Sequence, residues 1–194
     1  GSCTKIWIKS ENCQRLQFGT KALCWGTSII SKQEPDSTFT TICITNDFGP
    51  RAGGIESFVI GLLERLPGRT VIVYTSSQGD TREYDQRWLE QFGVLVLRDK
   101  AKILLPTPRV IRAVKSIIRE NGLNNVFFGA AAPLGICSRS LRKAGAQNIV
   151  ALTHGHEVWW SKIWPFKAAI KFMGNNIDHL TYLGDYTRGE ISKS

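Results

Sequence analysis

Residues 41–58, TICITNDFGPRAGGIESF, indicate the local architecture around which the chain folds. The short apolar run Thr41–Thr45 is followed by a turn that contains Gly53 and Gly54, and then by residues with helical spacing. A helix N-terminus presents unpaired N–H groups and the positive end of the helix dipole, so such a turn can hold an anion. Because they lack side chains, the two glycines would let a phosphate approach the backbone. Simple tight turns have the same pattern, so the stretch alone is compatible with both interpretations.

Apolar runs rich in β-branched residues recur from residue 39 onward and alternate with helical patterns. The first helical pattern has apolar residues at i, i+3, i+4 and i+7 between Ile55 and Leu66. Another has Thr107 as N-cap and Pro108 as first helical residue, and ends before Gly122. This alternation is typical of a parallel sheet covered on both faces, so we predict an α/β, Rossmann-like three-layer domain with a mostly parallel sheet. The predicted strands are residues 39–45, 70–75, 94–97, 125–129, 148–153 and 179–183, and the other predicted helices are 82–91, 135–144 and 161–173.

Length, charge and cysteine content limit the classes of protein to consider. A chain of 194 residues suits one domain, or one domain with an appendage. The net charge of +9 favours partners that carry phosphate, such as nucleic acid or an anionic membrane surface. The five cysteines form no CxxC pair, which predicts neither a disulfide framework nor a zinc site and favours a reducing, cytoplasmic setting. No run has the pattern of a signal peptide or a membrane span.

The first 38 residues show no sustained helical or strand period. The chain also starts with Gly-Ser and no Met, which resembles the remnant of a cleaved tag. We therefore expect an N-terminal extension at residues 1–38 and the Rossmann-like domain at residues 39–194.

Ligands of parallel sheets bind at the carboxyl ends of the strands, near the switch in strand order. That rule selects the loops after the first, fourth, fifth and sixth predicted strands, which are residues 47–54, 129–135, 154–157 and 184–188. Neither the GxGxxG dinucleotide fingerprint with its acidic partner nor a phosphate-binding P-loop is present, which argues against NAD and against P-loop phosphoryl transfer.

The motif THGHE at residues 153–157 places two of the three histidines and a carboxylate after a strand. Zinc binding would need further ligands, and the H-x-E with P-C-x-x-C pattern of zinc deaminases is missing. The imidazoles could instead be bonded to backbone in a structural role. They could also contact a ligand, because neutral imidazole exchanges hydrogen bonds with sugar hydroxyls.

Four basic residues of the helix after Thr107 are spaced 3, 3 and 4 apart and so share the face opposite its apolar stripe. Such a face is commonly just solvated, but it also suits an anionic lipid surface. Nucleic-acid binding usually brings exposed aromatic residues among the basic ones, and this face has none. We therefore expect no nucleic acid and assign the face to a membrane surface, through Arg109, Arg112, Lys115 and Arg119.

Four motifs together resemble a known family. TNDFGPRAGGI (45–55), FGAAAPL (128–134), THGHE (153–157) and YTR (186–188) are similar, in this order, to the N-terminal half of GT-B glycosyltransferases of family 4. The resemblance extends from about residue 39 to the end and is strongest to the actinobacterial phosphatidylinositol-mannoside mannosyltransferases. It implies a retaining transfer of mannose from GDP-mannose to a phosphatidylinositol-type lipid, with no metal and no other cofactor.

The resemblance also implies roles for individual residues. Gly53 and Gly54 would lie beside the donor diphosphate and the acceptor. His154 would contact the transferred sugar, where it positions the ring and stabilises its positive charge without acting as a general base. The remaining donor- or acceptor-binding residues would be Asp47, Arg51, Gly129, Pro133 and Glu157.

In this family a second, C-terminal domain holds most of the nucleotide-sugar, and it would begin where this sequence stops. We therefore expect the chain by itself to be inactive, to expose its cleft face, and to self-associate or bind its own residues 1–38 there. The expected location is cytoplasmic, peripheral on the inner face of the plasma membrane. The alternative is a non-catalytic basic module that binds an anionic membrane or nucleic acid.

Overall fold

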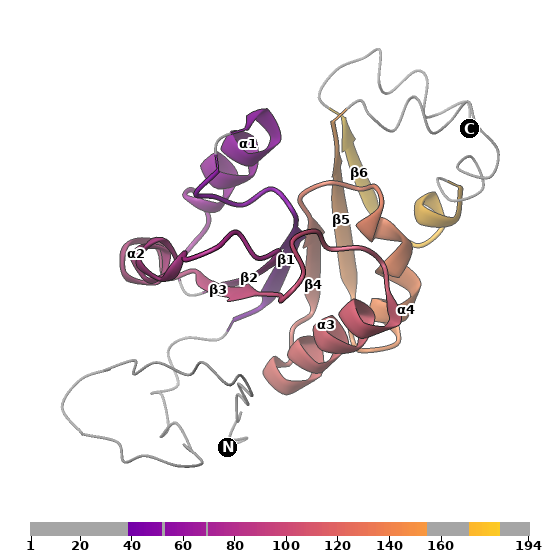
Figure 1. Ribbon diagram of the computed structural model, residues 1–194. Helices are drawn as coiled ribbons and strands as arrows, with labels where there is room; N and C mark the ends of the chain where they lie inside the picture. The colour runs from indigo at the N-terminus through magenta and orange to yellow at the C-terminus, as the bar shows by residue number, and fades with distance from the viewer. Residues whose placement is uncertain (1–38, 52, 69, 155–170, 183–194) are drawn as a thin grey trace.

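The computed structural model describes residues 39–51, 53–68, 70–154 and 171–182. Six strands within them form one sheet in the order β3-β2-β1-β4-β5-β6, and all five pairings are parallel (Figure 1). This confirms the predicted α/β, Rossmann-like fold and places the switch in strand order between β1 and β4. The strands are β1 (Thr41–Thr45), β2 (Val71–Thr75), β3 (Leu95–Arg98), β4 (Asn125–Phe128), β5 (Asn148–Thr153) and β6 (His179–Tyr182).

Helices cover both faces of the sheet and complete the three layers. α1 (Gly54–Leu63) and α2 (Arg82–Phe92) lie on one face, and α3 (Pro108–Asn121) and α4 (Ser138–Arg142) lie on the other (Figure 1). A short 3₁₀ helix, η1 (Leu134–Cys137), leads into α4. None of the described helices has the length and hydropathy needed to cross a bilayer.

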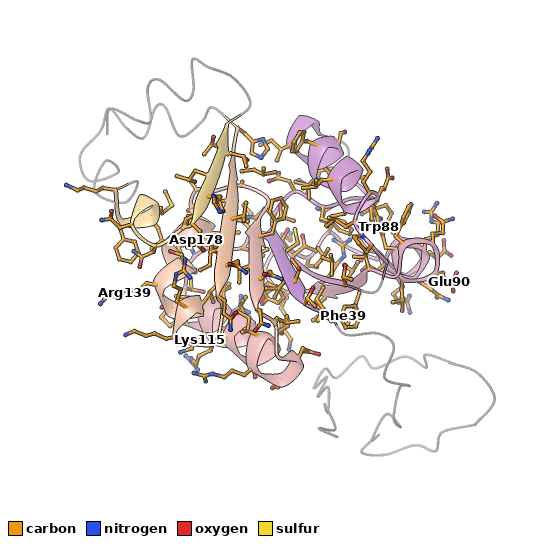
Figure 2. All side chains as sticks on the ribbon, turned by 180° about the vertical axis from the view of Figure 1, so that it is seen from behind. Phe39, Trp88, Glu90, Lys115, Arg139 and Asp178 are labelled. Atoms are coloured by element: carbon orange, nitrogen blue, oxygen red, sulfur yellow. The ribbon has the colours of Figure 1, made fainter. Side chains whose placement is uncertain are left out.

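The alternation of side chains along each strand supplies one hydrophobic core to each face. In β1, Ile42 and Ile44 pack in the core beneath α3 and α4, whereas Cys43 packs in the core beneath α1 and α2. Figure 2 shows Trp88, the buried residue of α2, in the space between α1 and α2, and its ring packs on that of Phe48 at 5.1 Å between centroids. Because both faces of the sheet are covered by an apolar core, the strands appear in the sequence as near-continuous apolar runs.

The local signals of α3 are confirmed. The Thr107 side chain accepts a hydrogen bond from the Val110 N–H at 3.4 Å, and Pro108 occupies the first helical position. Gly122 ends the helix with φ of 62°, a left-handed conformation that glycine adopts without strain. The predicted apolar face is also confirmed, because its central residues are buried: Val110, Val114 and Ile118.

The predicted apolar stripe of α1 is only partly correct. The helix ends at Leu63, so Leu66 lies beyond the last turn and is exposed. Phe58 is 42% exposed, because it lies on the side of α1 that faces His154 rather than the sheet. The predicted helix at 161–173 lies largely outside the described residues, and only 171–174 are seen as helix. Residues 1–38 also lie outside them.

Candidate functional site

Three segments predicted to carry the site meet at the carboxyl edge of the sheet. The loop between β1 and α1, residues 46–53, and the loop after β4, residues 129–133, flank the switch in strand order. His154 follows β5, the next strand of the sheet. Parallel sheets bind ligands at such a point.

The loop between β1 and α1 is held in place by side chains from two other strand ends. Gln78, after β2, donates to the Phe48 carbonyl at 2.9 Å and accepts from the Arg51 N–H at 3.3 Å. Arg98, at the end of β3, donates to the Gly49 carbonyl at 2.7 Å. Neither Gln78 nor Arg98 is among the predicted site residues, and no local pattern marks them.

Arg98 links this loop to α2. Its guanidinium forms a two-point ion pair with Asp85, with Nη2–Oδ1 at 2.7 Å and Nε–Oδ2 at 2.8 Å. It also donates to the Ser76 carbonyl at 3.3 Å and lies 5.8 Å from the centre of the Phe48 ring. Bidentate arginine pairs of this kind fix geometry as well as charge. The loop is therefore preorganised by its own domain.

Gly53 and Gly54 are not required by the domain's own structure. Gly53 is the N-cap of α1 with φ of −161°, an extended conformation that any residue adopts. Among the described residues, a Cβ on Gly54 would meet no atom within 4 Å, and one on Gly53 would meet only Glu56, at 3.7 Å. Gly129 differs, because its Cβ would lie 2.6 Å from the Thr45 hydroxyl oxygen. The glycine pair thus leaves open space at a helix N-terminus beside the strand switch.

His154 is half-buried and anchored within its own domain. Its Nε2 donates to the Gly129 carbonyl at 2.6 Å, which places a proton on Nε2. In the neutral tautomer with this proton, Nδ1 is an acceptor. The imidazole also meets the Phe58 ring edge to face at 6.2 Å between centroids. The hydrogen bond ties the carboxyl ends of β4 and β5 together beside α1.

Glu56 is a site residue that the sequence analysis missed. It is the third residue of α1, it is only 7% exposed, and its Oε1 has no hydrogen-bond partner among the described residues. Burial raises the pKa of this carboxyl and the charge of Asp47 raises it further, against the opposing effect of Arg51 and Arg98. The sequence offered only helical periodicity here, which does not reveal an unpaired acid.

The other predicted ligand-binding residues are spread around these loops. Asp47 is half-buried, and its backbone N–H donates to the Thr45 hydroxyl at 3.0 Å. The Arg51 side chain is exposed at the rim of the same loop. Pro133 is half-buried and precedes η1. Glu157 lies outside the described residues, as does the rest of its motif after His154. Among the residues that are described, no group of three or more His, Cys, Asp or Glu side chains is placed to hold a metal ion.

Arg109 has a partner that the sequence did not indicate. Both terminal nitrogens bind the buried carboxylate of Asp99, at 2.7 and 2.8 Å, and the Tyr74 hydroxyl donates to the same carboxylate. Burial by itself would raise the pKa of Asp99, but the hydrogen bonds from Arg109 and Tyr74 outweigh it and lower the pKa to about 2. Arg112 and Arg119 are exposed and Lys115 is half-buried, and within the described ranges none of the three forms an ion pair. The basic face therefore carries three unpaired charges and one paired charge.

Residues 52–193 match the family described as "Glycosyltransferase Family 4". The chain belongs to this family. Like the fold, the match supports the resemblance seen in the four sequence motifs. In this member of glycosyltransferase family 4, the candidate site lies at the carboxyl ends of β1, β4 and β5.

Three curated relatives of this family 4 chain are mannosyltransferases by name. The GDP-mannose-dependent monoacylated alpha-(1-6)-phosphatidylinositol monomannoside mannosyltransferase of Corynebacterium glutamicum is 37% identical over 149 residues, 76% of this chain and 38% of the relative. The GDP-mannose-dependent alpha-(1-6)-phosphatidylinositol monomannoside mannosyltransferases of Mycolicibacterium smegmatis and Mycobacterium tuberculosis are 37% and 33% identical. Each of these two matches covers 79% of this chain and 40% of the relative. The chain thus spans well under half the length of the relatives.

Among solved structures, L-sorbose reductase from Gluconobacter frateurii superposes with a TM-score of 0.43 at 16% identity, over 70% of this chain and 62% of that one. A likeness of this size carries no argument about function.

Proposed function

We propose that this chain is the N-terminal, acceptor-binding half of a retaining glycosyltransferase that moves mannose from GDP-mannose to a phosphatidylinositol-type lipid. The names of the relatives support the donor and the lipid class. In this proposal residues 39–194 form the acceptor-binding domain, residues 1–38 are an extension, and a further domain supplies most of the contacts to the donor. No metal ion or other cofactor takes part.

The observation that carries the proposal is the open N-terminus of α1 at the strand switch. Negative charge develops on the diphosphate as the bond to the sugar breaks, and preorganised N–H groups stabilise that charge. The first turn of α1 supplies such groups together with the positive end of the helix dipole. Gly53 and Gly54 leave the approach open, although nothing inside the domain requires glycine there.

His154 is assigned to positioning the sugar. The bond from Nε2 to the Gly129 carbonyl fixes the ring plane, so the imidazole needs no reorganisation when a sugar arrives. A retaining transfer through a cationic sugar also benefits from an electron-rich neutral ring beside the reacting carbon. In this account His154 does not abstract a proton.

The test is a transfer assay with radiolabelled GDP-mannose and vesicles that contain phosphatidylinositol. It uses the product of the complete reading frame, because the proposal places the donor site in a further domain. The account expects labelled mannose in the lipid fraction, with the α configuration of the donor retained in the product. Absence of transfer to every inositol lipid offered would refute the proposed function.

We also propose that the protein binds the inner face of the plasma membrane from the cytoplasm as a peripheral protein. The loop between β3 and α3 exposes two aliphatic residues, Ile103 at 65% and Leu105 at 51%. Leu104 between them is buried and held by Asn46, which accepts from the Leu104 N–H at 2.6 Å and donates to its carbonyl at 3.0 Å. The loop thus presents two apolar side chains in a fixed geometry. Two exposed lysines come just before them in the chain, Lys100 and Lys102.

Reversing Arg112 and Lys115 to Glu should weaken binding to anionic vesicles about tenfold or more, since each basic residue near the surface contributes about 1 kcal/mol. The effect should shrink as the salt concentration rises. Co-sedimentation with phosphatidylserine vesicles and with neutral vesicles measures it. The matched control reverses Arg65 and Arg87, which lie on the opposite layer with α1 and α2. Equal losses in both double variants would show that net charge alone acts, and no loss would remove α3 from the membrane surface.

The same surface would also serve a non-catalytic module that only docks on anionic membranes. The exposed Ile103 and Leu105 beside the basic face favour a membrane over nucleic acid as the partner of such a module. The transfer assay separates the two candidates. Vesicle binding without any transfer of mannose would favour the module.

A further inference from the structure

The side chain of Glu56 is buried without a partner for one of its oxygens. Three buried side-chain atoms lack a hydrogen bond among the described residues, namely Glu56 Oε1 and the hydroxyl oxygens of Thr75 and Ser138. A hydroxyl is a small polar group, whereas a carboxyl that loses its contacts with water costs far more when left unpaired. Such a cost is commonly retained where the group serves a ligand. The unpaired carboxyl of Glu56 therefore needs an explanation more than the two hydroxyls do.

The carboxyl lies directly under the loop of the candidate site. A Cβ built on Gly49 would lie 3.1 Å from Oε1 and would collide with the phenol of Tyr84, and one built on Gly53 would lie 3.7 Å from Oε2. Oε1 and the Tyr84 phenol therefore both lie against the turn at Gly49. Gln78 and Arg98 hold this turn in place, and Oε2 lies on the side of Gly53, where the N-terminus of α1 is open.

Structural roles for Glu56 do not account for this geometry. A glutamate at the third helical position can accept a hydrogen bond from the N-cap N–H, but no such bond forms with Gly53. Arg98 is close enough to influence the carboxyl, yet its guanidinium hydrogens go to Asp85, Gly49 and Ser76. Neither a helix cap nor an ion pair therefore explains the buried carboxyl of Glu56.

We propose that Glu56 binds ring hydroxyl groups of a polyol, a hexose or a cyclitol, that enters at the open N-terminus of α1. Oε2 faces this open end and can accept hydrogen bonds from ring hydroxyls, and a protonated carboxyl can also donate one. The inference rests on the proposed transferase function and makes Glu56 a binding residue of that site. The polyol is either the transferred sugar of the donor or the inositol ring of the acceptor lipid.

Two variants test the inference, Glu56→Gln and Glu56→Met. Both keep the length of the side chain, and Met removes all hydrogen bonding. The control is Glu64→Gln, which changes an exposed acid just after α1. Binding of methyl α-D-mannopyranoside and of glycerophosphoinositol to the chain is measured by saturation-transfer NMR, with melting temperatures recorded for every variant.

The expected result is that the parent and Glu64→Gln bind at least one probe, whereas Glu56→Met weakens that binding tenfold or more. Glu56→Gln should lie between them, because its amide keeps one acceptor oxygen. The melting temperature of Glu56→Met should be unchanged or raised, since an unpaired buried acid has been removed. Loss of mannoside binding assigns the donor sugar, and loss of glycerophosphoinositol binding assigns the acceptor.

Unchanged affinity in Glu56→Met, or a parent that binds neither probe, would overturn the inference. A lower melting temperature with unchanged affinity would likewise show a purely structural role. These measurements need no turnover, so a failure of the transferase proposal is visible separately. If the transferase proposal alone fails, the probes still bind through Glu56, but the product of the complete reading frame transfers no mannose.

Discussion

In the product of the complete reading frame, His154→Ala is expected to lower kcat/KM for mannose transfer by about two orders of magnitude or more, roughly 2.7 kcal/mol of transition-state stabilisation. The ring is anchored on the Gly129 carbonyl at 2.6 Å, so it meets a bound sugar in a fixed orientation. Loss of one backbone hydrogen bond should cost about 1 kcal/mol of stability. The melting temperature should therefore fall only slightly. Steady-state kinetics and thermal unfolding of the same preparation measure both effects.

Two variants separate the chemical role of His154 from its structural one. His154→Gln can still donate to the Gly129 carbonyl but lacks the imidazole, so it should regain stability and remain nearly inactive. His179→Ala removes an exposed histidine at the start of β6 and should behave like the parent. Normal turnover of His154→Ala, or full recovery of activity in His154→Gln, would show that His154 is purely structural and only connects β4 to β5.

In the product of the complete reading frame, Gly54→Val is expected to lower kcat/KM about a hundredfold while the fold stays intact. A Cβ at this position meets no atom of the described residues within 4 Å, so the substitution should not disturb their packing. The added side chain instead occupies the space through which a diphosphate would reach the first turn of α1. Gly54→Ala should show a smaller loss of activity and a stability equal to the parent's or higher, by up to about 1 kcal/mol.

Two other glycines give matched controls for this prediction. Gly61→Ala lies in the same helix, where its Cβ would meet only the flexible tip of Arg65 at 3.4 Å, so activity should be unchanged. Gly129→Ala should destabilise the fold, because its Cβ would lie 2.6 and 2.7 Å from side-chain atoms of Thr45. Full activity in Gly54→Val would mean that the open helix end is not used by the donor.

The parts of the fold that depend on local sequence were predictable. Apolar runs of β-branched residues located all six strands, and the Thr107 cap with Pro108 and Gly122 located α3 to the residue. The extent of an exposed surface was not predictable in this way. Phe58 fits the apolar period of α1, but periodicity does not tell where the covering layer ends.

Contacts that bring together distant parts of the chain were beyond the sequence. Arg98 reaches Gly49 across 49 residues because β3 and β1 end at the same edge of the sheet. Arg109 binds Asp99 and so differs from the other basic residues of α3, which no spacing rule could show. Gly129 was selected for ligand binding by resemblance, and the structure shows that close packing on Thr45 also requires glycine there.

The most direct test of the central claim is an amide NMR titration of the ¹⁵N-labelled chain with glycerophosphoinositol. The claim is that substrate binds where the loops after β1, β4 and β5 meet. We expect chemical-shift changes that cluster in residues 47–54 and 129–132 and at His154, while the amides of α3 stay unchanged. Changes confined to α3, or saturation without any change in the loop between β1 and α1, would contradict it.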